Sequence, residues 1–443
     1  MKKVLSLLLV VVMILAVALT CASCGEEDKP ADETPAAYGF EGTKEVAKQG
    51  SVNTTADQIT LTGDVSKVKI GLIMIGDETE GYTKAHMDGI KNAAKNLGIA
   101  DDQLIWKLVV PETDAVVTAG NQLIADGCTY VFSNSYGHQS YMQTLAEENP
   151  TIHFVAATGD TAAALNYTNF SNCFTGVYQS RYVSGVVAGL KLKELIDGNK
   201  LSAENKDKDG NYKIGYVGAF NYAEVVSGYT AFYLGIKSIV PEVAMQVQYT
   251  SSWFDFDKEK AAAQVLIGNG CCIIGQHADS AGAPTAVEEA LKNGKVVYSV
   301  GYNVSMLDAC PTGALTSATN NWTVYYQYAL ACAINGENIA TNWAAGYEKN
   351  AVGITEFGPA CAAGTEAKVN ETVAGIKNGS IKVFDTSKFT VGGKTVTWAF
   401  ASDTNGDWTN DANNVISDGQ FLESYVQAAP AFALRIDGIT ELN

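Results

Sequence analysis

The stretch KIGLIMIG at residues 69–76 decides the fold together with a second stretch, KIGYVGAF, at residues 213–220. The first run is apolar at nearly every position, which is typical of a parallel strand that is covered on both faces. Apolar residues at helical spacing follow over residues 82–98 and end at Gly98. Strand and helix patterns then alternate to residue 158, and they alternate again from 213 to 301. The sequence therefore predicts an α/β protein with two similar lobes, each built on a parallel sheet.

Polar and aromatic residues collect directly after the predicted strands of both lobes. Because ligands of open parallel sheets sit outside the carboxyl ends of the strands, two facing lobes predict one shared cleft. The segments that would border this cleft are 76–83, 133–139, 218–225, 250–257, 275–284 and 301–306.

The N-terminus predicts a targeting segment. Lys2 and Lys3 precede an apolar run over residues 4–20, and small residues stand directly before Cys24. This pattern resembles a bacterial lipobox and predicts a lipoprotein signal peptide over 1–23, with Cys24 as the lipidated residue. One alternative is acylation at Cys21, for which Leu19 and Thr20 suit the cleavage less well, and another is an uncleaved membrane anchor, for which the run is short. Residues 24–66 are polar and predict a flexible tether, so we expect a protein held by its lipid on the extracytoplasmic face of the cell membrane.

Composition excludes several classes of function. The formal net charge of −18 repels phosphate backbones, so nucleic acid is not expected as a partner. Of the nine cysteines, Cys21 would be removed with the signal peptide and Cys24 would be acylated. The other seven lie mostly in apolar surroundings, and we expect mostly free, buried thiols. No Cys/His spacing fits zinc, and the oxygen-rich stretch 403–414 lacks the order of an EF-hand loop. We therefore expect no metal and no cofactor.

Four aromatic residues are candidates for a flat ligand's binding site, because rings from opposite walls of a cleft can stack on its two faces. At the ligand's edge, Asp279 would accept hydrogen bonds, and Asn303 would both donate and accept them. The alternatives are that each aromatic fills the core and that Asp279 caps the next helix. No GxSxG, P-loop or GxGxxG motif is present, which disfavours catalysis and phosphate binding. The aromatic candidates are Tyr82, Tyr136, Trp253 and Tyr302.

Several segments resemble the basic membrane protein (BMP) family, substrate-binding lipoproteins of ABC transporters that are similar to purine nucleoside receptors. The resemblance covers about residues 67–340 and is carried by EGYTKAHMDGI (80–90), YQSRYVSGVVAGL (178–190), KIGYVGAFNYAEVVSGYTAFYLGIKSIVPE (213–242), SSWFDFDKEKAAAQVLI (251–267) and GQHADSAGAP (275–284).

The resemblance implies a type I periplasmic-binding-protein fold, in which two Rossmann-like lobes are joined by a three-stranded hinge. We expect the first lobe at 67–195 and about 320–345, and the second at 213–305. Residues 346–443 would form a C-terminal extension that packs on the lobes.

The resemblance also implies a non-enzymatic function, the capture of a purine nucleoside or nucleobase for an ABC permease and its ATPase. The alternatives are a surface sensor or adhesin-like lipoprotein and, more weakly, a nucleoside hydrolase that uses His277 and Asp279. By position, Trp253 would be the stacking aromatic of the second lobe and Tyr82 that of the first. The other residues implied in the cleft are Glu224, His277, Asp279, Tyr302 and Asn303, with Tyr136 as a further aromatic of the first lobe.

Overall fold

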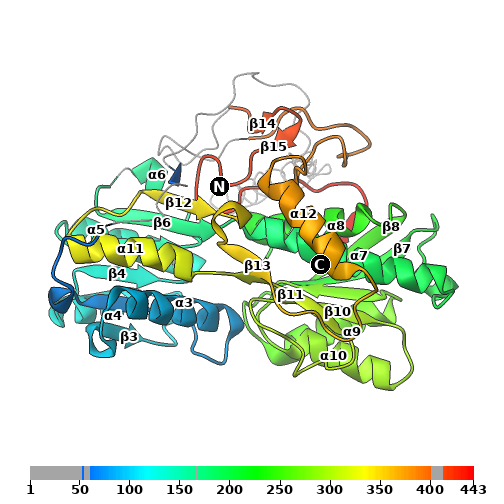
Figure 1. The fold of residues 1–443 in the computed structure, drawn as a ribbon, viewed down its shortest axis with the longest axis horizontal. Coiled ribbons are helices and arrows are strands. Elements are labelled where there is room, and N and C mark those ends of the chain that lie inside the picture. The colour runs from blue at the N-terminus through cyan, green and yellow to red at the C-terminus, as the bar shows by residue number, and fades with distance from the viewer. Residues whose placement is uncertain (1–51, 54–59, 166, 401–412) are drawn as a thin grey trace, which may run out of the picture.

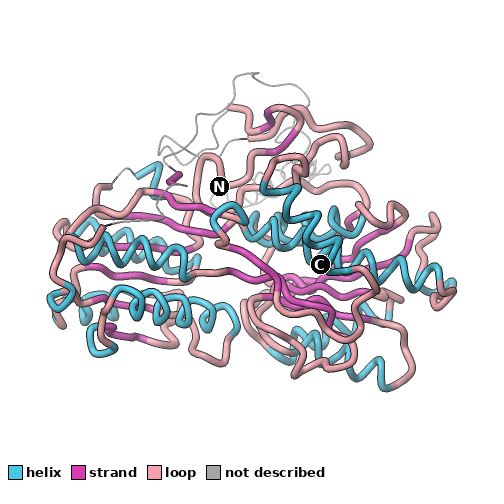
Figure 2. Tube along the Cα trace, in the orientation of Figure 1, coloured by secondary structure: helices cyan, strands magenta, loops and turns pink. Residues whose placement is uncertain are grey.

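A computed structural model describes residues 52–53, 60–165, 167–400 and 413–443. Two seven-stranded sheets lie side by side, each with helices on both faces (Figures 1 and 2). The expected signal peptide, Cys24 and most of the stretch 403–414 lie outside the described residues. Within the described ranges, no helix combines the length and apolar character needed to cross a membrane.

The first lobe has an all-parallel sheet in the order β1-β12-β6-β5-β4-β2-β3. Helices α3 and α11 pack together on one face, and α4 and α5 cover the other. The strands are β1 (Val52–Asn53), β2 (Ile70–Ile73), β3 (Leu104–Lys107), β4 (Tyr130–Ser133), β5 (His153–Ala157), β6 (Phe170–Thr175) and β12 (Asn342–Ala345). The helices are α3 (Gly81–Leu97), α4 (Ala115–Ala125), α5 (Gln139–Glu148), α6 (Ala162–Leu165) and α11 (Thr323–Asn335).

The second lobe has the order β13-β11-β10-β9-β7-β8-β16, with only β13 antiparallel to its neighbour. Helices α7 and α8 pack together, and α9 packs against α10. The strands are β7 (Tyr212–Gly218), β8 (Val243–Tyr249), β9 (Ile273–Gln276), β10 (Tyr298–Tyr302), β11 (Ala314–Asn320), β13 (Val352–Ile354) and β16 (Ile439–Glu441). The helices are α7 (Val177–Asp197), α8 (Ala223–Lys237), α9 (Phe256–Gly268) and α10 (Gly282–Lys292).

The chain crosses between the lobes three times, after β6, after β11 and after β12. These crossings form the three-stranded hinge, and the expected type I fold is confirmed. The first crossing comes earlier than the sequence-based boundary at 195, because α7 packs on α8 of the second lobe. Glycine makes this contact close: a Cβ on Gly185 would lie 2.2 Å from the carbonyl oxygen of Phe232. The polar segment between α7 and β7 contains a 3₁₀ helix (Ala203–Asn205) and a turn within the second lobe, so it marks no lobe boundary.

Part of the expected tether is ordered against the first lobe. Strand β1 pairs with β12 at the edge of the sheet. The Asn335 side chain then accepts hydrogen bonds from the backbone N–H groups of Thr62 (2.8 Å) and Gly63 (3.1 Å). These contacts use backbone groups, so a polar sequence with few large apolar residues can still be held in place.

The C-terminal extension does more than pack on the lobes, because β13 and β16 join the second sheet. Between them come α12 (Thr365–Lys377), which packs on α7, and the pair β14 (Ile416–Ser417) and β15 (Gln420–Phe421). The ring of Phe432 stacks on that of Phe384 with 4.2 Å between centroids.

The prediction for the cysteines is confirmed within the described residues. The seven cysteines there are free, and all except the half-buried Cys361 are buried.

Candidate functional site

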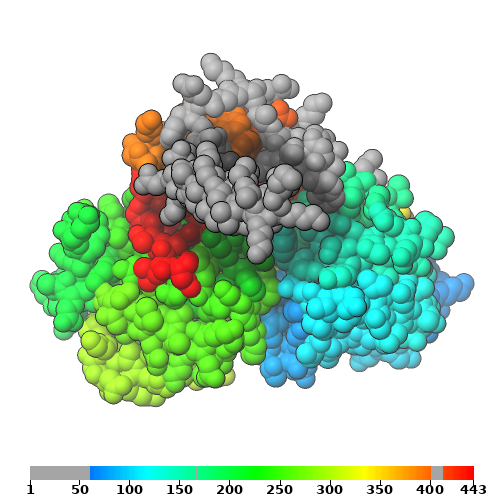
Figure 3. Space-filling view, turned by 180° about the vertical axis from the view of Figure 1, so that it is seen from behind, coloured from blue at the N-terminus to red at the C-terminus, as the bar shows by residue number. Residues whose placement is uncertain are grey.

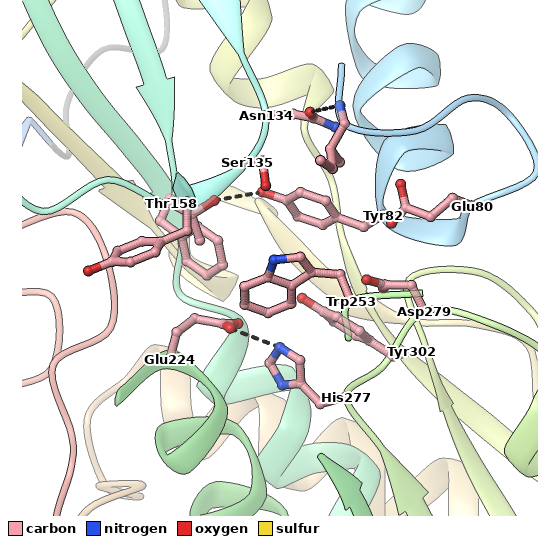
Figure 4. Close-up of a pocket in the computed structure, with 13 residues that line it drawn as sticks. Glu80, Tyr82, Asn134, Ser135, Thr158, Glu224, Trp253, His277, Asp279 and Tyr302 are labelled. Atoms are coloured by element: carbon pink, nitrogen blue, oxygen red, sulfur yellow. Dashed lines mark hydrogen bonds and ion pairs between the residues drawn. The ribbon is translucent and has the colours of Figure 1, made fainter. Parts of the chain in front are cut away.

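A cavity of about 380 Å³, including its open mouth, lies between the lobes at the carboxyl ends of the strands (Figure 4). Its size falls within the range of roughly 300–1,000 Å³ typical of small-molecule sites. It is lined by Ile75, Glu80, Tyr82, Asn134, Ser135, Tyr136, Thr158, Phe174, Glu224, Trp253, His277, Asp279 and Tyr302.

The cavity brings together every candidate ligand-binding residue from the sequence except Asn303, which lies behind Asp279. Sequence reasoning missed six further lining residues. Most of them stand at the ends of strands that the sequence had already placed along the cleft, so the rule that located Tyr136 could also have found them. They are Ile75, Glu80, Asn134, Ser135, Thr158 and Phe174.

Aromatic rings from both lobes form the walls. Tyr82 stands in the first turn of α3, where its hydroxyl lies 3.1 Å from the Thr158 hydroxyl and its ring meets His86 edge-on at 4.6 Å. Trp253 follows β8 in the second lobe, and its ring meets that of Phe220 edge-on at 4.8 Å. The buried indole N–H of Trp253 has no hydrogen-bond partner among the described residues. Trp253 therefore offers a ligand a ring face and a free donor.

A buried chain of hydrogen-bonded polar groups fixes the tautomer of His277 and its hydrogen bond to Glu224. Arg181 on α7 donates from Nη2 to Nδ1 of His277 at 3.2 Å, and His277 Nε2 lies 2.8 Å from Glu224 Oε2. A guanidinium can only donate, so Nδ1 is the acceptor and Nε2 carries the proton that it donates to Glu224. Burial lowers the pKa of His277, although the nearby Glu224 opposes that shift. The imidazole is therefore neutral at pH 7.

Arg181 does not line the cavity, but it contacts two residues that do, His277 and Tyr302. It is 2 % exposed, and its guanidinium carbon lies 3.5 Å from the ring centroid of Tyr302. The cation thus holds both a lining ring and a lining imidazole in place. Sequence reasoning missed Arg181, because it stands inside a helix and does not follow a strand end, although it lies within the family-like stretch 178–190.

A second chain runs from Asp279 to the hinge. Asn303 Nδ2 donates to Asp279 Oδ1 at 2.7 Å, and Asn320 Nδ2 donates to Asn303 Oδ1 at 2.8 Å. Asn320 also accepts a hydrogen bond from the hydroxyl of Thr175. Asn320 and Thr175 end the two strands β11 and β6, from which the chain crosses between lobes. The carboxyl group in the cavity is therefore linked to two of the three hinge crossings.

The helix-capping alternative for Asp279 is not what the structure shows. The hydroxyl of Ser280 accepts a hydrogen bond from the Gly282 N–H at 3.0 Å, at the start of α10. Gln276 also has a structural role, because its amide donates to the carbonyl oxygens of Ala278 and Ser280. Of the polar residues in this loop, His277 and Asp279 are left to line the cavity.

Two carboxyl groups meet at one end of the cavity, Glu80 from the first lobe and Asp279 from the second (Figure 4). The lobes approach closely here, since a Cβ on Gly81 would lie 3.3 Å from the carbonyl oxygen of Asp279. Burial raises the pKa of both carboxyl groups, and the charge of Glu80 raises that of Asp279 further. The pair consequently retains a proton at a higher pH than isolated carboxyl groups do.

Backbone conformations with positive φ cluster around the cavity. Thr158, Ser251 and Asn303 have φ values of 64°, 53° and 61°. Such values are unusual for residues other than glycine, and especially for a β-branched residue such as threonine. Strain of this kind persists where the surrounding structure imposes it, commonly at binding sites. Here it stands directly after β5, β8 and β10.

The site's polar groups suit a small organic ligand. Among the described residues, no group of three or more His, Cys, Asp and Glu side chains is arranged to hold a metal ion. What the cavity offers is ring faces, carboxyl acceptors and the donor of Trp253.

Comparison with known proteins agrees with this arrangement. Residues 67–387 match the model of the Bmp family, described as ABC transporter substrate-binding protein PnrA-like. The chain is 29% identical over 327 residues to "Purine-binding protein BAB2_0673" of Brucella abortus, which covers 72% of this chain and 83% of that protein. It is also 29% identical over 365 residues to "Putative ABC transporter glucose-binding protein TsgA13" of Haloferax volcanii, covering 81% and 83% of the two chains.

Solved structures share the fold at low sequence identity. A solute-binding protein of an ABC transporter system from Aeropyrum pernix superposes with a TM-score of 0.58 at 15% identity, covering 72% of this chain and 93% of that one. Because the family model matches most of the chain and begins where the first lobe begins, this protein belongs to the Bmp family of PnrA-like ABC transporter substrate-binding proteins.

Proposed function

We propose that this protein is a lipid-anchored, extracytoplasmic receptor that captures a purine nucleoside or nucleobase between its lobes and delivers it to an ABC permease. The observation that carries the proposal is the cavity itself, in which rings from both lobes face a space bordered by carboxyl groups. A purine has two flat faces and an edge with several N–H and ring-nitrogen groups, so it complements such a cavity. The purine-binding relative supports the same ligand class.

In the proposed complex, the ring of Trp253 covers one face of the purine and the first-lobe rings of Tyr82 and Tyr136 cover the other. Glu224 accepts a hydrogen bond from the ligand through the oxygen that His277 does not occupy. Asp279 contacts the ligand's edge, and Asn303 holds Asp279 in position.

The charge of the cavity narrows the ligand class. Glu80, Glu224 and Asp279 line it. Among the described residues, no Lys or Arg lines it, and Arg181 is buried behind His277 and Tyr302. A phosphate group would meet carboxyl groups without a facing cation. We therefore expect nucleosides and bases to bind and nucleotides to be rejected.

A calorimetric panel tests the ligand class. We expect binding of at least one purine nucleoside or base, no binding of the matching 5′-monophosphate, and no binding of glucose. Glucose belongs in the panel because a relative carries that ligand in its name. Binding of glucose without any purine would overturn the proposal, while tight binding of the monophosphate would refute the argument from charge.

The lipid anchor is tested separately, because Cys24 lies outside the described residues. We expect a radiolabelled or clickable fatty acid to label the full-length protein in cells and not the Cys24→Ala variant. Cys21→Ala is the matched control and should label normally. Label that persists in Cys24→Ala would show that the anchor is elsewhere, and no label in the parent would show that it is absent.

Delivery to a permease distinguishes a transport receptor from a sensor that reuses the fold. We expect deletion of the gene to abolish uptake of the identified ligand, and the ligand-binding variant Trp253→Ala to fail to restore it. Normal uptake in the deletion strain would favour the sensor.

A further inference from the structure

Arg181 is a buried cation on α7 whose direct hydrogen-bond partners are neutral. Its Nη1 donates to the carbonyl oxygen of Gln276 at 2.5 Å, and its Nη2 donates to Nδ1 of His277 at 3.2 Å. Helix α8 comes close at Gly228, where a Cβ would lie 3.3 Å from His277 Nδ1 and 3.5 Å from Arg181 Nε. Burying an ion without a counter-charge is unfavourable, so the charge of Arg181 needs a partner beyond His277.

Glu224 is that partner, and the imidazole of His277 connects the two charges. His277 Nε2 lies 2.8 Å from Glu224 Oε2. Because Nδ1 accepts from Arg181, the imidazole donates to the carboxylate through Nε2 and stays neutral. Burial lowers the pKa of His277, the carboxylate opposes that shift, and the charge of Arg181 lowers the pKa further. One fixed positive charge and one negative charge therefore balance each other across a neutral ring.

Within the described residues, the titratable side chains around these three groups add no second cation that pairs with Glu224. They are two tyrosines, which stay neutral because burial raises the pKa of each phenol, and two carboxyl groups. One of the carboxyl groups belongs to the C-terminal extension, whose end, in red, lies on the second lobe in the view from behind (Figure 3). The charge of Arg181 is therefore the one that balances Glu224. The four side chains are Tyr216 on β7, Tyr302 on β10, Asp279 after β9 and Glu423 on the extension.

Closure of the lobes makes this balance matter for binding. The side chain of Glu224 is 11 % exposed in the structure, whereas water would solvate it in an open cleft. We propose that Arg181 is a positioning residue for ligand capture, which supplies through His277 the counter-charge that lets the lobes close over an ionised Glu224. A guanidinium keeps its charge at every pH that a protein meets in a cell, so capture does not require the imidazole to take up a proton. This role rests on the ligand binding at Glu224 proposed above.

The imidazole signals of the protein without ligand, measured by NMR, give the first test. Arg181, His277 and Glu224 all belong to the second lobe, so their contacts persist when the lobes open. The chain has only four histidines, and His277→Gln identifies one signal by its loss. In the parent we expect this imidazole to stay neutral, with its proton on Nε2, from about pH 8 to about pH 5.5. In Arg181→Gln it should take up a proton in this range, because the carboxylate remains and the opposing cation is gone. Equal behaviour of the two proteins overturns the proposal.

Calorimetry of the full chain at two pH values measures the effect on capture, with whichever of adenosine, guanosine, adenine and guanine binds the parent most tightly. At about pH 8, Arg181→Gln should bind about tenfold more weakly, because closure buries an uncompensated carboxylate. At about pH 5.5, where the protonated imidazole replaces the missing cation, the loss should be less than about threefold. Effects of the other carboxyl groups cancel in the ratio of variant to parent. A ratio that does not change with pH overturns the proposal.

A double variant shows whether Arg181 acts through Glu224. Glu224→Gln removes the carboxylate, so adding Arg181→Gln to it should weaken binding by less than about twofold. A further loss of about tenfold would mean that Arg181 only supports the fold, and would overturn the proposal.

Two further variants keep the test independent of folding. Arg181→Lys retains a cation, so its His277 signal should stay neutral and its affinity relative to the parent should not change with pH; a titrating imidazole here also overturns the proposal. Lys193→Met removes a cation from the exposed part of the same helix and should bind like the parent. Melting temperatures identify any loss of fold, and Arg181→Lys decides the outcome if Arg181→Gln does not fold. If no purine binds the parent, the proposed function fails, while the His277 signals still decide the role of Arg181.

Discussion

The two walls of the cavity differ in chemistry although they come from similar lobes. The wall of the first lobe is held mainly by neutral groups: Tyr82 lies against Thr158, and Asn134 bridges the Ile75 N–H and the Thr83 hydroxyl. The wall of the second lobe rests on a buried Arg181 and carries Glu224, His277 and Asp279. Corresponding strand ends therefore supply aromatic rings and neutral groups in the first lobe, and ionisable side chains in the second. Glu80 is the acidic exception in the first lobe.

The largest expected effect follows from removing the cation beneath the second wall. Arg181→Met should lower the free energy of unfolding by about 3 kcal/mol, because the buried acceptors of His277 and Gln276 lose their donor. Urea denaturation measures it. The control Lys193→Met breaks an exposed ion pair with Asp197 on the same helix and should cost less than about 1 kcal/mol. Similar losses in both variants would contradict the importance assigned to Arg181.

Next comes the stacking residue of the second wall. Trp253→Ala should weaken ligand binding by about 2–3 kcal/mol, since both burial and stacking are lost, whereas Trp253→Phe should cost about 1 kcal/mol. Calorimetry with the best ligand of the panel measures both. Trp106→Ala on β3, away from the cavity, should bind normally. Unimpaired binding by Trp253→Ala would mean that the indole only fills the core.

Within the loop after β9, binding and capping can be separated. Asp279→Ala should weaken ligand binding by about 1.5–3 kcal/mol, the scale of a hydrogen bond to a charged group. Ser280→Ala should leave affinity nearly intact and lower stability by about 1 kcal/mol, because the Gly282 N–H at the start of α10 loses its hydrogen-bond acceptor. Affinity and melting temperature of both variants test the difference. The reverse pattern would assign the binding role to the wrong residue.

The carboxyl pair that joins the two walls predicts a dependence of stability on pH. Because burial raises the pKa of Glu80 and Asp279, the folded state binds more protons than the unfolded state above the ordinary carboxyl pKa of about 4. Stability should therefore fall as pH rises through the raised values. We expect Glu80→Gln to flatten this decline, because one of the two titrating carboxyl groups is removed.

Three other buried carboxyl groups set the background for this comparison, among them Asp160, whose pKa is also raised by burial. Burial raises the pKa of Glu259 to about 7 and that of Glu423 to about 8. All three contribute to the decline in the parent and in Glu80→Gln, so the informative quantity is the difference between the two denaturation series. Parallel series would show that Glu80 and Asp279 do not share a proton.

The smallest effect is expected in the first wall. Tyr82→Phe keeps the ring and removes one hydroxyl contact with Thr158, so stability and affinity should each change by less than about 1 kcal/mol. Tyr82→Ala, which removes the ring, should bind clearly more weakly. A large effect of Tyr82→Phe would show that this wall also reads the ligand through a polar group, against the contrast drawn between the lobes.

Several features of the site could be predicted from the sequence because they follow from local patterns. Apolar runs predicted the strands, and apolar residues at helical spacing predicted the helices between them. The segments that follow the strands contain Tyr82, Trp253 and His277. The sequence predicted that Asn303 lines the cavity, whereas its amide lies behind Asp279 and donates to that carboxyl group. The two residues are far apart in the chain, so the sequence pattern did not reveal this hydrogen bond.

The sequence by itself determined the α/β class, the two lobes and the edge at which the cavity lies, since hydrophobic periodicity specifies strands and helices and the carboxyl ends of parallel strands share one edge. Only the tertiary structure decided which groups meet there. Arg181 comes from a helix interior, and it reaches His277 and Tyr302 through contacts between elements far apart in the chain. Such contacts depend on burial, charge and packing in three dimensions, which no local pattern encodes.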